Sequence, residues 1–206
     1  MKKLSIVTIC FIAIVFIACS GGGSSEKRII VAASGKLTVT DKTIKLEPSL
    51  SHNEQELTFK DDKLTLTVQN TNGPSKTYDL TDNGVYVLNL QIDTLIGGVV
   101  NYGSVGMPGR ITAEQLDHII DSTQKLMQGL NADDAKEIYF LPPFAIKKVS
   151  AKLNTKVIGS FKGIPYNNEA DNTGSVPDVI KFFTNKQKRE TLTDLLTEKA
   201  KIKGGS

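Results

Sequence analysis

The chain has 206 residues, with 25 basic and 22 acidic side chains, two histidines and a formal net charge of +3 at pH 7. This near balance provides no basic field for a nucleic-acid backbone. Tryptophan is absent and aromatic residues make up only 6%, which weakens a sugar-binding function based on large aromatic faces. The length suffices for one domain, or two small ones, with an ordinary apolar core.

Residues 1–18 have the pattern of a secretory signal peptide. Lys2 and Lys3 precede an uncharged run, Leu4 to Ala18, which is shorter than the roughly 20 apolar residues of a membrane-crossing helix. Phe16-Ile17-Ala18-Cys19 resembles the lipobox of bacterial lipoproteins, with Phe16 where leucine is usual. The resemblance implies cleavage before Cys19, a diacylglycerol on its sulfur and acylation, commonly with palmitate, of the new N-terminus. An ordinary signal peptide or an uncleaved anchor is the alternative.

The expected mature chain retains one cysteine. Cys10 lies in the removed segment, so we expect no internal disulfide, no thiolate zinc site and no cofactor. Residues 19–28 comprise the lipidated cysteine and a tether, in which Ser20 to Ser25 (SGGGSS) is flexible by composition. By analogy with the lipoprotein sorting rule, Ser20 in place of an aspartate favours the outer membrane. The predicted location is the bacterial cell envelope, with membrane attachment through the lipid.

Residues 29–96 are predicted to form a β-rich region. The clearest unit is Leu57 to Val68, where alternating apolar residues on both sides of Asp61-Asp62 predict a hairpin with one buried face. Six or seven short strands at this spacing favour a small antiparallel β-sandwich or partial barrel. The other predicted strands are Ile29–Ala33, Leu37–Val39, Ile44–Leu46, Thr77–Leu80 and Val85–Ile92.

Residues 97–206 are predicted to form an α+β region that packs with residues 29–96 as one domain. After a glycine-rich stretch, Thr112 and Gln115 form the pattern of a capping box, flanked by Ile111 and Leu116 as a hydrophobic staple. Gly129 suits the end of this helix. We expect the helix to pack across the sheet through an apolar stripe, with Met127 as a core residue. The stripe is Leu116, Ile119, Ile120, Thr123, Met127 and Leu130.

Strand patterns return after this helix, and helical patterns end the chain. A helix is expected to begin at Ser175–Asp178, and a second is expected over Lys188–Ala200. The apolar residues of the first are Val179, Ile180, Phe182 and Phe183. The predicted fold class is therefore α+β: a sandwich or partial barrel with a packed amphipathic helix and C-terminal helices. The strands expected in this half are Ile138–Leu141, Phe144–Val149 and Lys156–Phe161.

No catalytic set emerges from these patterns. Residues 97–109 lack the Lys and Ser or Thr of a phosphate-binding loop, and Ser104 lacks the first glycine of a nucleophile elbow. His52 is expected in a polar turn, and His118 on the solvent face of the helix. Glu169 and Asp171 resemble the first half of a calcium loop, but Ile180 stands at the twelfth position. Residues 181–203 are basic enough to lie on anionic lipid, although a solvated helix face is the simpler interpretation.

The sequence favours a non-catalytic binding or assembly module that contacts an envelope protein, peptide or glycan. Tyrosine and arginine are common interface residues, so the candidate binding residues are Tyr102, Arg110, Tyr166, Asn168 and Glu169. Whether the protein is an enzyme stays open. The alternatives are an envelope hydrolase that uses Asp or Glu carboxylates, and a small-ligand carrier whose strands enclose an apolar cavity.

Overall fold

The computed structural model describes residues 25–101, 112–165, 168–170 and 174–204. It is an α+β protein, with ten strands in two sheets and two helices among the described residues, 22% helical and 45% strand. The signal peptide and Cys19 lie outside the described residues, as do Ser104, Ile111 and the candidate residues Tyr102, Arg110, Tyr166 and Asp171. Within the described residues, no helix combines the length and the apolar character needed to cross a membrane.

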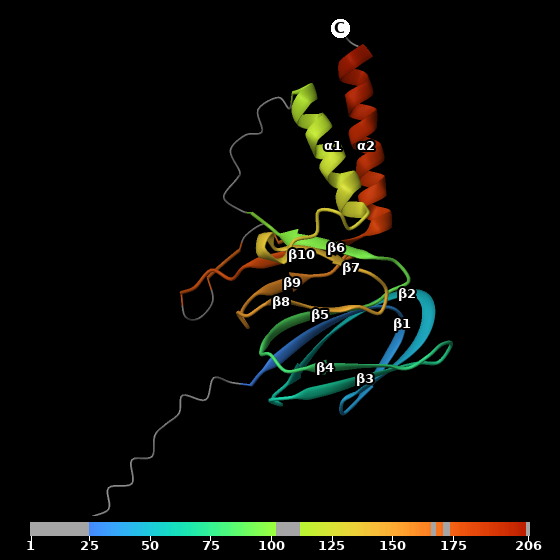
Figure 1. The fold of residues 1–206 in the computed structure, drawn as a ribbon, viewed down its shortest axis with the longest axis vertical. Coiled ribbons are helices and arrows are strands. Elements are labelled where there is room, and N and C mark those ends of the chain that lie inside the picture. The colour runs from blue at the N-terminus through green and yellow to red at the C-terminus, as the bar shows by residue number, and fades with distance from the viewer. Residues whose placement is uncertain (1–24, 102–111, 166–167, 171–173, 205–206) are drawn as a thin grey trace, which may run out of the picture.

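The first sheet has six strands in the order β4-β3-β2-β1-β5-β8 and curls into a nearly closed barrel (Figure 1). The second has four strands in the order β7-β6-β10-β9. The strands of the first sheet are β1 Lys27–Thr40, β2 Thr43–Phe59, β3 Leu64–Asn70, β4 Lys76–Leu80, β5 Gly84–Leu90 and β8 Ile146–Ser150. Those of the second are β6 Leu95–Val99, β7 Ile138–Leu141, β9 Lys156–Ile158 and β10 Val179–Thr184.

Two cores result from the alternation along β1 and β5. Ile29 and Val31 point into the barrel, while Ile30 and Ala32 point toward the second sheet. Because both faces are covered, every residue of β5 is buried. Antiparallel pairs predominate, but β1–β5, β2–β3 and β9–β10 are parallel. The barrel interior is filled by side chains, with residues such as Leu64, Leu66 and Leu88 fully buried.

The predicted hairpin over Leu57–Val68 is wrong. Leu57 lies near the end of β2, which pairs antiparallel with β1, and β3 pairs in parallel with residues 43–46 at the other end of β2. Alternation identifies the buried face of each strand, but it does not identify the neighbouring strand. Asp61 and Asp62 do lie between the two strands, and their carbonyl oxygens accept hydrogen bonds from buried Lys27 at 2.6 and 2.9 Å.

The predicted helix at Ser175–Phe183 is also wrong, because Val179–Thr184 is the strand β10. All but one of its residues are buried, including Lys181 and Thr184, so apolar residues do not alternate with exposed polar ones and the pattern does not separate helix from strand. The chain ends instead in one long helix, α2, Asn185–Gly204. Its capping box, Thr184 with Gln187, precedes the predicted start at Lys188.

The amphipathic helix α1, Ala113–Met127, has the predicted capping box, since Gln115 N donates to Thr112 Oγ1 and Thr112 N donates to Gln115 Oε1. Gly129 follows its end with φ +77°. The expectation that α1 lies across a sheet is wrong, because its main contact is with α2. The two helices project together from one end of the body, opposite the end at which residue 25 enters (Figure 1).

Candidate functional site

A cavity of about 540 Å³ opens where the core between the two sheets ends. We call it the Phe161 cavity. Five segments surround it: β1 at Ser34, the middle of β2, the β5–β6 turn, the loop after β9, and the chain from the end of β10 into the first two turns of α2. Its lining residues are Ser34, Ser49, Leu50, His52, Gln91, Ile92, Asp93, Phe161, Thr184, Lys186, Gln187 and Glu190.

The wall formed by β2 results from an irregularity in its pairing with β1. Ser34 pairs with His52, but the next residue, Gly35, pairs with Pro48, so residues 49–51 have no partner in β1. Gly35 has φ +134°, and a Cβ there would lie 2.2 Å from the carbonyl oxygen of Glu47. Only glycine fits this close approach. The bulge turns Leu50 into solvent, where its side chain is 90% exposed.

The floor is formed where the parallel pairing of β1 with β5 ends. The last register pair of this parallel ladder is Ala33 with Leu90, and Ser34 and Gln91 follow directly. Both are nine-tenths or more buried, at 6% and 3% exposure. Gln91 Nε2 donates to Ser160 Oγ at 3.4 Å. Among the described residues, neither Gln91 Oε1 nor the Ser34 hydroxyl has a hydrogen-bond partner, so the floor retains unused hydrogen-bonding capacity.

The β5–β6 turn that carries Gln91 is held firmly. Asn89 Nδ2 donates to the carbonyl oxygens of Asp93 and Leu141, both at 2.9 Å, and Asn89 Oδ1 accepts from Gln91 N at 2.9 Å. Asp93 in turn accepts from Thr94 N at 2.8 Å and from Lys186 N at 2.9 Å. The Asp93 carboxylate therefore fixes the start of α2 beside the cavity, which is a structural role.

The start of α2 and the loop after β9 are joined through Gln187. The backbone nitrogen of Gln187 donates to Thr184 Oγ1 at 3.1 Å, and its side-chain Nε2 donates to the carbonyl oxygen of Ser160 at 2.9 Å. The next residue in the loop, Phe161, stacks on His52 with ring centroids 3.5 Å apart. His52 therefore lies in β2 and supports the Phe161 ring rather than occupying the predicted polar turn.

The buried side chain of Lys181 also fixes the loop after β9. Lys181 Nζ donates to the carbonyl oxygens of Gly159 and Lys162 at 2.5 and 2.6 Å. Burial lowers the pKa of Lys181, and the nearby Glu54 carboxylate acts in the opposite direction. Glu54 forms an ion pair with Lys162 at 2.6 Å. These contacts fix the backbone of the loop that carries Phe161 and forms one wall of the cavity.

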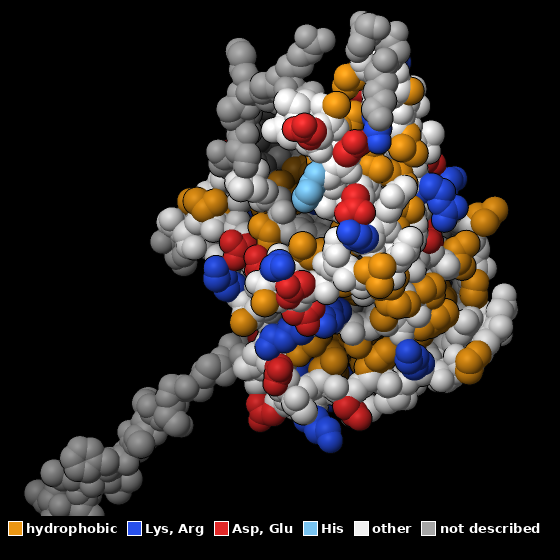
Figure 2. All heavy atoms as spheres, turned by 45° about the horizontal axis from the view of Figure 1, so that its top comes forward, with side chains coloured by type: hydrophobic (Ala, Val, Ile, Leu, Met, Phe, Trp, Pro, Cys, Tyr) orange, Lys and Arg blue, Asp and Glu red, His pale blue; other side chains and the backbone are white. Residues whose placement is uncertain are grey.

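The rim of the cavity is apolar. Leu50 and Ile92 are 90% and 79% exposed and Phe161 is 51% exposed, and all three line this one cavity. In Figure 2, hydrophobic side chains gather on the right of the body, the side on which β2 bends and β5 leads into β6 in Figure 1. Lys, Arg, Asp and Glu are interspersed on the left. A neutral polar floor beneath an apolar rim suits binding of a neutral ligand.

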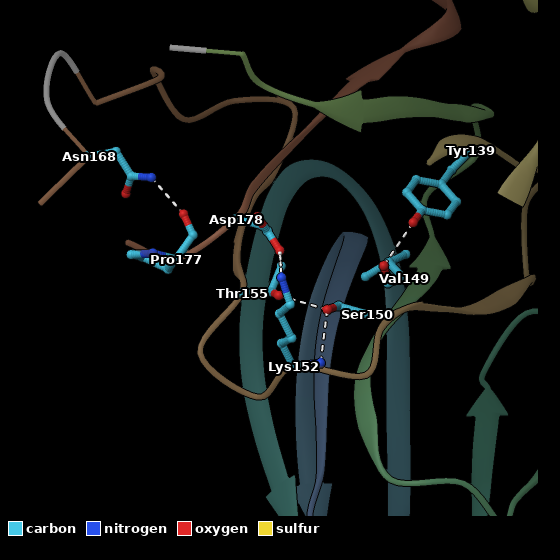
Figure 3. A network of polar contacts seen from close by, with 8 residues as sticks. All are labelled: Tyr139, Val149, Ser150, Lys152, Thr155, Asn168, Pro177 and Asp178. Carbon is cyan, nitrogen blue, oxygen red and sulfur yellow. Dashed lines mark hydrogen bonds and ion pairs between the residues drawn. The ribbon is translucent and has the colours of Figure 1, made fainter. Parts of the chain in front are cut away.

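The two described candidate residues lie elsewhere. Asn168 Nδ2 donates to the carbonyl oxygen of Pro177 at 2.6 Å (Figure 3). Asn168 Oδ1 accepts from Lys156 Nζ at 3.4 Å. Asn168 thus closes its own loop beside β10, in a shallow hollow with Val99 and Val176. Glu169 is exposed. The structure places neither residue in the Phe161 cavity.

A second polar network lies near Asn168 and is structural. Lys152 forms an ion pair with Asp178 at 2.9 Å, and Ser150 Oγ accepts from Lys152 N and from Thr155 Oγ1 at 3.0 and 2.7 Å (Figure 3). Tyr139 donates to the carbonyl oxygen of Val149 at 2.7 Å. These contacts tie the loop after β8 to the start of β10.

Sequence reasoning missed the cavity residues Ser34, Gln91 and Phe161. Each continues or follows a strand pattern and resembles an ordinary strand end. Ile92 carries a usable signal of an exposed apolar position, because it ends the predicted strand Val85–Ile92 and is followed directly by Asp93, a turn residue. His118 is exposed on α1, as predicted. Across the described ranges, no cluster of three or more His, Cys, Asp or Glu residues is arranged to hold a metal ion.

No protein-family model matches the sequence, and neither a curated protein nor a solved structure matches the chain.

Proposed function

We propose that this protein is a non-catalytic binding or assembly module of the bacterial cell envelope, held at the membrane by lipid on Cys19. It binds a segment of a partner protein at the Phe161 cavity. The observation that carries this proposal is the concentration of exposed hydrophobic side chains, Leu50, Ile92 and Phe161, around one cavity. Exposed apolar groups that surround a hollow are typical of interaction sites.

The membrane location rests on the sequence alone. Phe16-Ile17-Ala18-Cys19 has the character of a lipobox, and the glycine and serine residues that follow suit a flexible tether. Two or three acyl chains hold a protein stably on a bilayer, since each buried CH₂ contributes about 0.8 kcal/mol. Because the described chain begins at the end of the body opposite the helices (Figure 1), this attachment leaves the Phe161 cavity open to a partner.

Two observations favour this function over its alternatives. The barrel interior is filled by side chains such as Val31, Leu66 and Leu88, which disfavours an interior ligand carrier. A hydrolase that uses carboxylates needs two free acids in one cleft. The cavity has Asp93 and Glu190, and both oxygens of Asp93 already accept backbone hydrogen bonds.

Site-specific photo-crosslinking tests the proposal. A photoreactive phenylalanine analogue replaces Leu50 in the full-length protein, produced in cells, and the control carries it at Thr77, which is exposed on β4. We expect one dominant envelope protein to crosslink from position 50 and not from position 77. Equal crosslinking from both positions, or none from position 50, would contradict the binding site.

The anchor is tested separately by intact mass. The mature protein should carry the mass of a diacylglycerol and an acyl chain at Cys19, and Cys19→Ala should leave the membrane fraction. An unmodified Cys19 in membrane-bound protein contradicts the anchor without bearing on the cavity.

A further inference from the structure

We propose that the Phe161 cavity recognises an uncharged peptide segment, with its floor hydrogen-bonding a backbone amide and its rim contacting an adjacent aliphatic side chain. This inference rests on the proposed function and adds the chemistry of the ligand.

The floor selects for a group that both donates and accepts. Gln91 Oε1 is an acceptor without a partner among the described residues, and the Ser34 hydroxyl both donates and accepts. The two residues are neighbours at the end of the β1–β5 ladder, so one small group can reach both. A secondary amide meets these requirements, with its N–H directed to Gln91 Oε1 and its carbonyl oxygen to the Ser34 hydroxyl.

Charged groups fit this floor poorly. Ser34 and Gln91 are both neutral and nine-tenths or more buried. A carboxylate or phosphate placed on them would lose its water without gaining a cation, which is costly. The lysine of the cavity, Lys186, is exposed and belongs to the first turn of α2. The floor therefore favours a neutral ligand group over an anion.

The rim favours a peptide over an acetamido sugar. A sugar ring stacks on an open aromatic face, and His52, stacked at 3.5 Å, leaves only one face of the Phe161 ring for such a contact. Leu50 and Ile92 instead present aliphatic surface, which suits a leucine or valine side chain. Residues 49–51 also have no partner in β1, and the pairing of β2 with β3 ends at Leu46. Ser51 N donates to Ser49 Oγ at 3.2 Å, and the other backbone groups of this stretch of β2 are offered to an extended segment.

The test compares an amide with an isosteric ester. The probes are N-acetyl-leucine N,N-dimethylamide, which has a single N–H, and its analogue in which that acetamide N–H is replaced by an ester oxygen. Binding to the full-length protein in detergent is followed through the methyl NMR signals of Leu50 and Ile92. We expect both signals to shift with the amide, and the ester to bind about fivefold or more weakly, because it leaves Gln91 Oε1 unpaired.

Gln91→Leu removes the acceptor and should abolish the difference between amide and ester, whereas Gln124→Leu, an exposed position on α1, should retain it. Unchanged methyl signals of buried Leu66 confirm that each variant is folded. If Gln91→Leu does not fold, Ser34→Ala serves in its place and should reduce amide binding.

Equal binding of amide and ester to the native protein overturns the inference. So does a larger shift of the same signals with N-acetylglucosamine, which would point to a sugar instead. Absence of any shift with all three probes also overturns it, and the crosslinking from position 50 then decides independently whether the cavity binds a partner at all.

Discussion

Glycine residues at two tight approaches show how single positions determine the fold. Gly35 permits the bulge of β2, and Gly84 begins β5 with φ +135°. Gly84 N donates to the carbonyl oxygen of Glu26 at 3.1 Å, and a Cβ at Gly84 would lie 2.3 Å from the carbonyl oxygen of Ser150. Both the backbone conformation and the space therefore require glycine where β5 lies between β1 and β8.

We expect Gly84→Ala to lower the free energy of unfolding by at least about 1–3 kcal/mol, the usual cost of a strained backbone conformation. Urea denaturation of a soluble form without the signal peptide and Cys19 measures the change. Gly163→Ala is the control, because no atom lies within 4 Å of the added Cβ. Similar unfolding midpoints for the two variants would show that the strand start tolerates a side chain.

Buried tyrosines make stability sensitive to alkaline pH. Burial raises the pKa of Tyr78 and of Tyr139 to about 12, from the ordinary value of 10.0. Between pH 10 and pH 12 these tyrosines therefore ionise in the unfolded chain but stay neutral in the folded protein. The contribution of each tyrosine is therefore complete below pH 10 and falls as the pH rises toward 12, by about 2 kcal/mol per residue.

Tyr78→Phe should flatten this alkaline decline. The substitution costs little at neutral pH, because the carbonyl oxygen of Phe144, which accepts from Tyr78 at 2.8 Å, also accepts from Lys76 at 2.7 Å. Burial lowers the pKa of Lys181 and Lys188. Below the ordinary lysine pKa these two groups therefore make stability rise with pH, opposite to the effect of the tyrosines. The measurement is thus the difference between native and variant unfolding free energies from pH 8 to 12, and a constant difference would refute the prediction.

At the scale of elements, the two helices depend on each other. Each begins with a capping box of the same pattern, Thr112 with Gln115 and Thr184 with Gln187, which explains where they start. Packing explains the rest. On α1, Leu116 and Ile120 are buried, whereas Ile119 is 39% exposed. Only part of the predicted apolar stripe is therefore covered by α2.

Neighbouring isoleucines provide a matched test of this packing. Ile120→Ala removes a side chain that is 6% exposed and should destabilise the protein by about 2–4 kcal/mol. Ile119→Ala alters a half-exposed side chain and should cost less than about 1 kcal/mol. Chemical denaturation of both variants measures the difference, and equal effects would mean that α1 does not pack on α2 as described.

At the scale of the whole molecule, β1 and β5 belong to both cores and β8 joins the first sheet from the C-terminal half of the chain. The second sheet contacts the first through residues such as Leu95 and Leu141. Because β1 and β5 contribute side chains to both cores, we expect the two halves of the described chain to unfold together as one domain.

Leu141→Ala tests this coupling. Leu141 lies on β7 in the second sheet and is 1% exposed, so its truncation should cost about 2–5 kcal/mol. Amide hydrogen exchange should then lose protection in β3 and β10 alike, whereas Leu130→Ala, at a position 69% exposed, should leave protection unchanged. Loss confined to the second sheet would indicate two separately folding units.

Local patterns were sufficient wherever the decisive interactions lie within one element. The strand Ile138–Leu141 and the capping box of α1 were predicted from sequence as the structure has them, because alternation and caps depend only on nearby residues. The prediction at β10 was wrong because the decisive interactions there lie between elements. Its residues are covered by neighbours on both sides, and burial on all sides removes the alternation by which a strand is identified.

The sequence by itself determined the class of fold, most strand positions and the start of α1, since these follow from hydrophobic period and turn chemistry. Only the tertiary structure decided which strands pair and where a ligand can bind. Ser34, Gln91 and Phe161 come from three distant segments and meet because the pairing of β1 with β5 ends beside the loop after β9. No local pattern encodes that meeting, because it depends on the register of one ladder and the packing of two sheets.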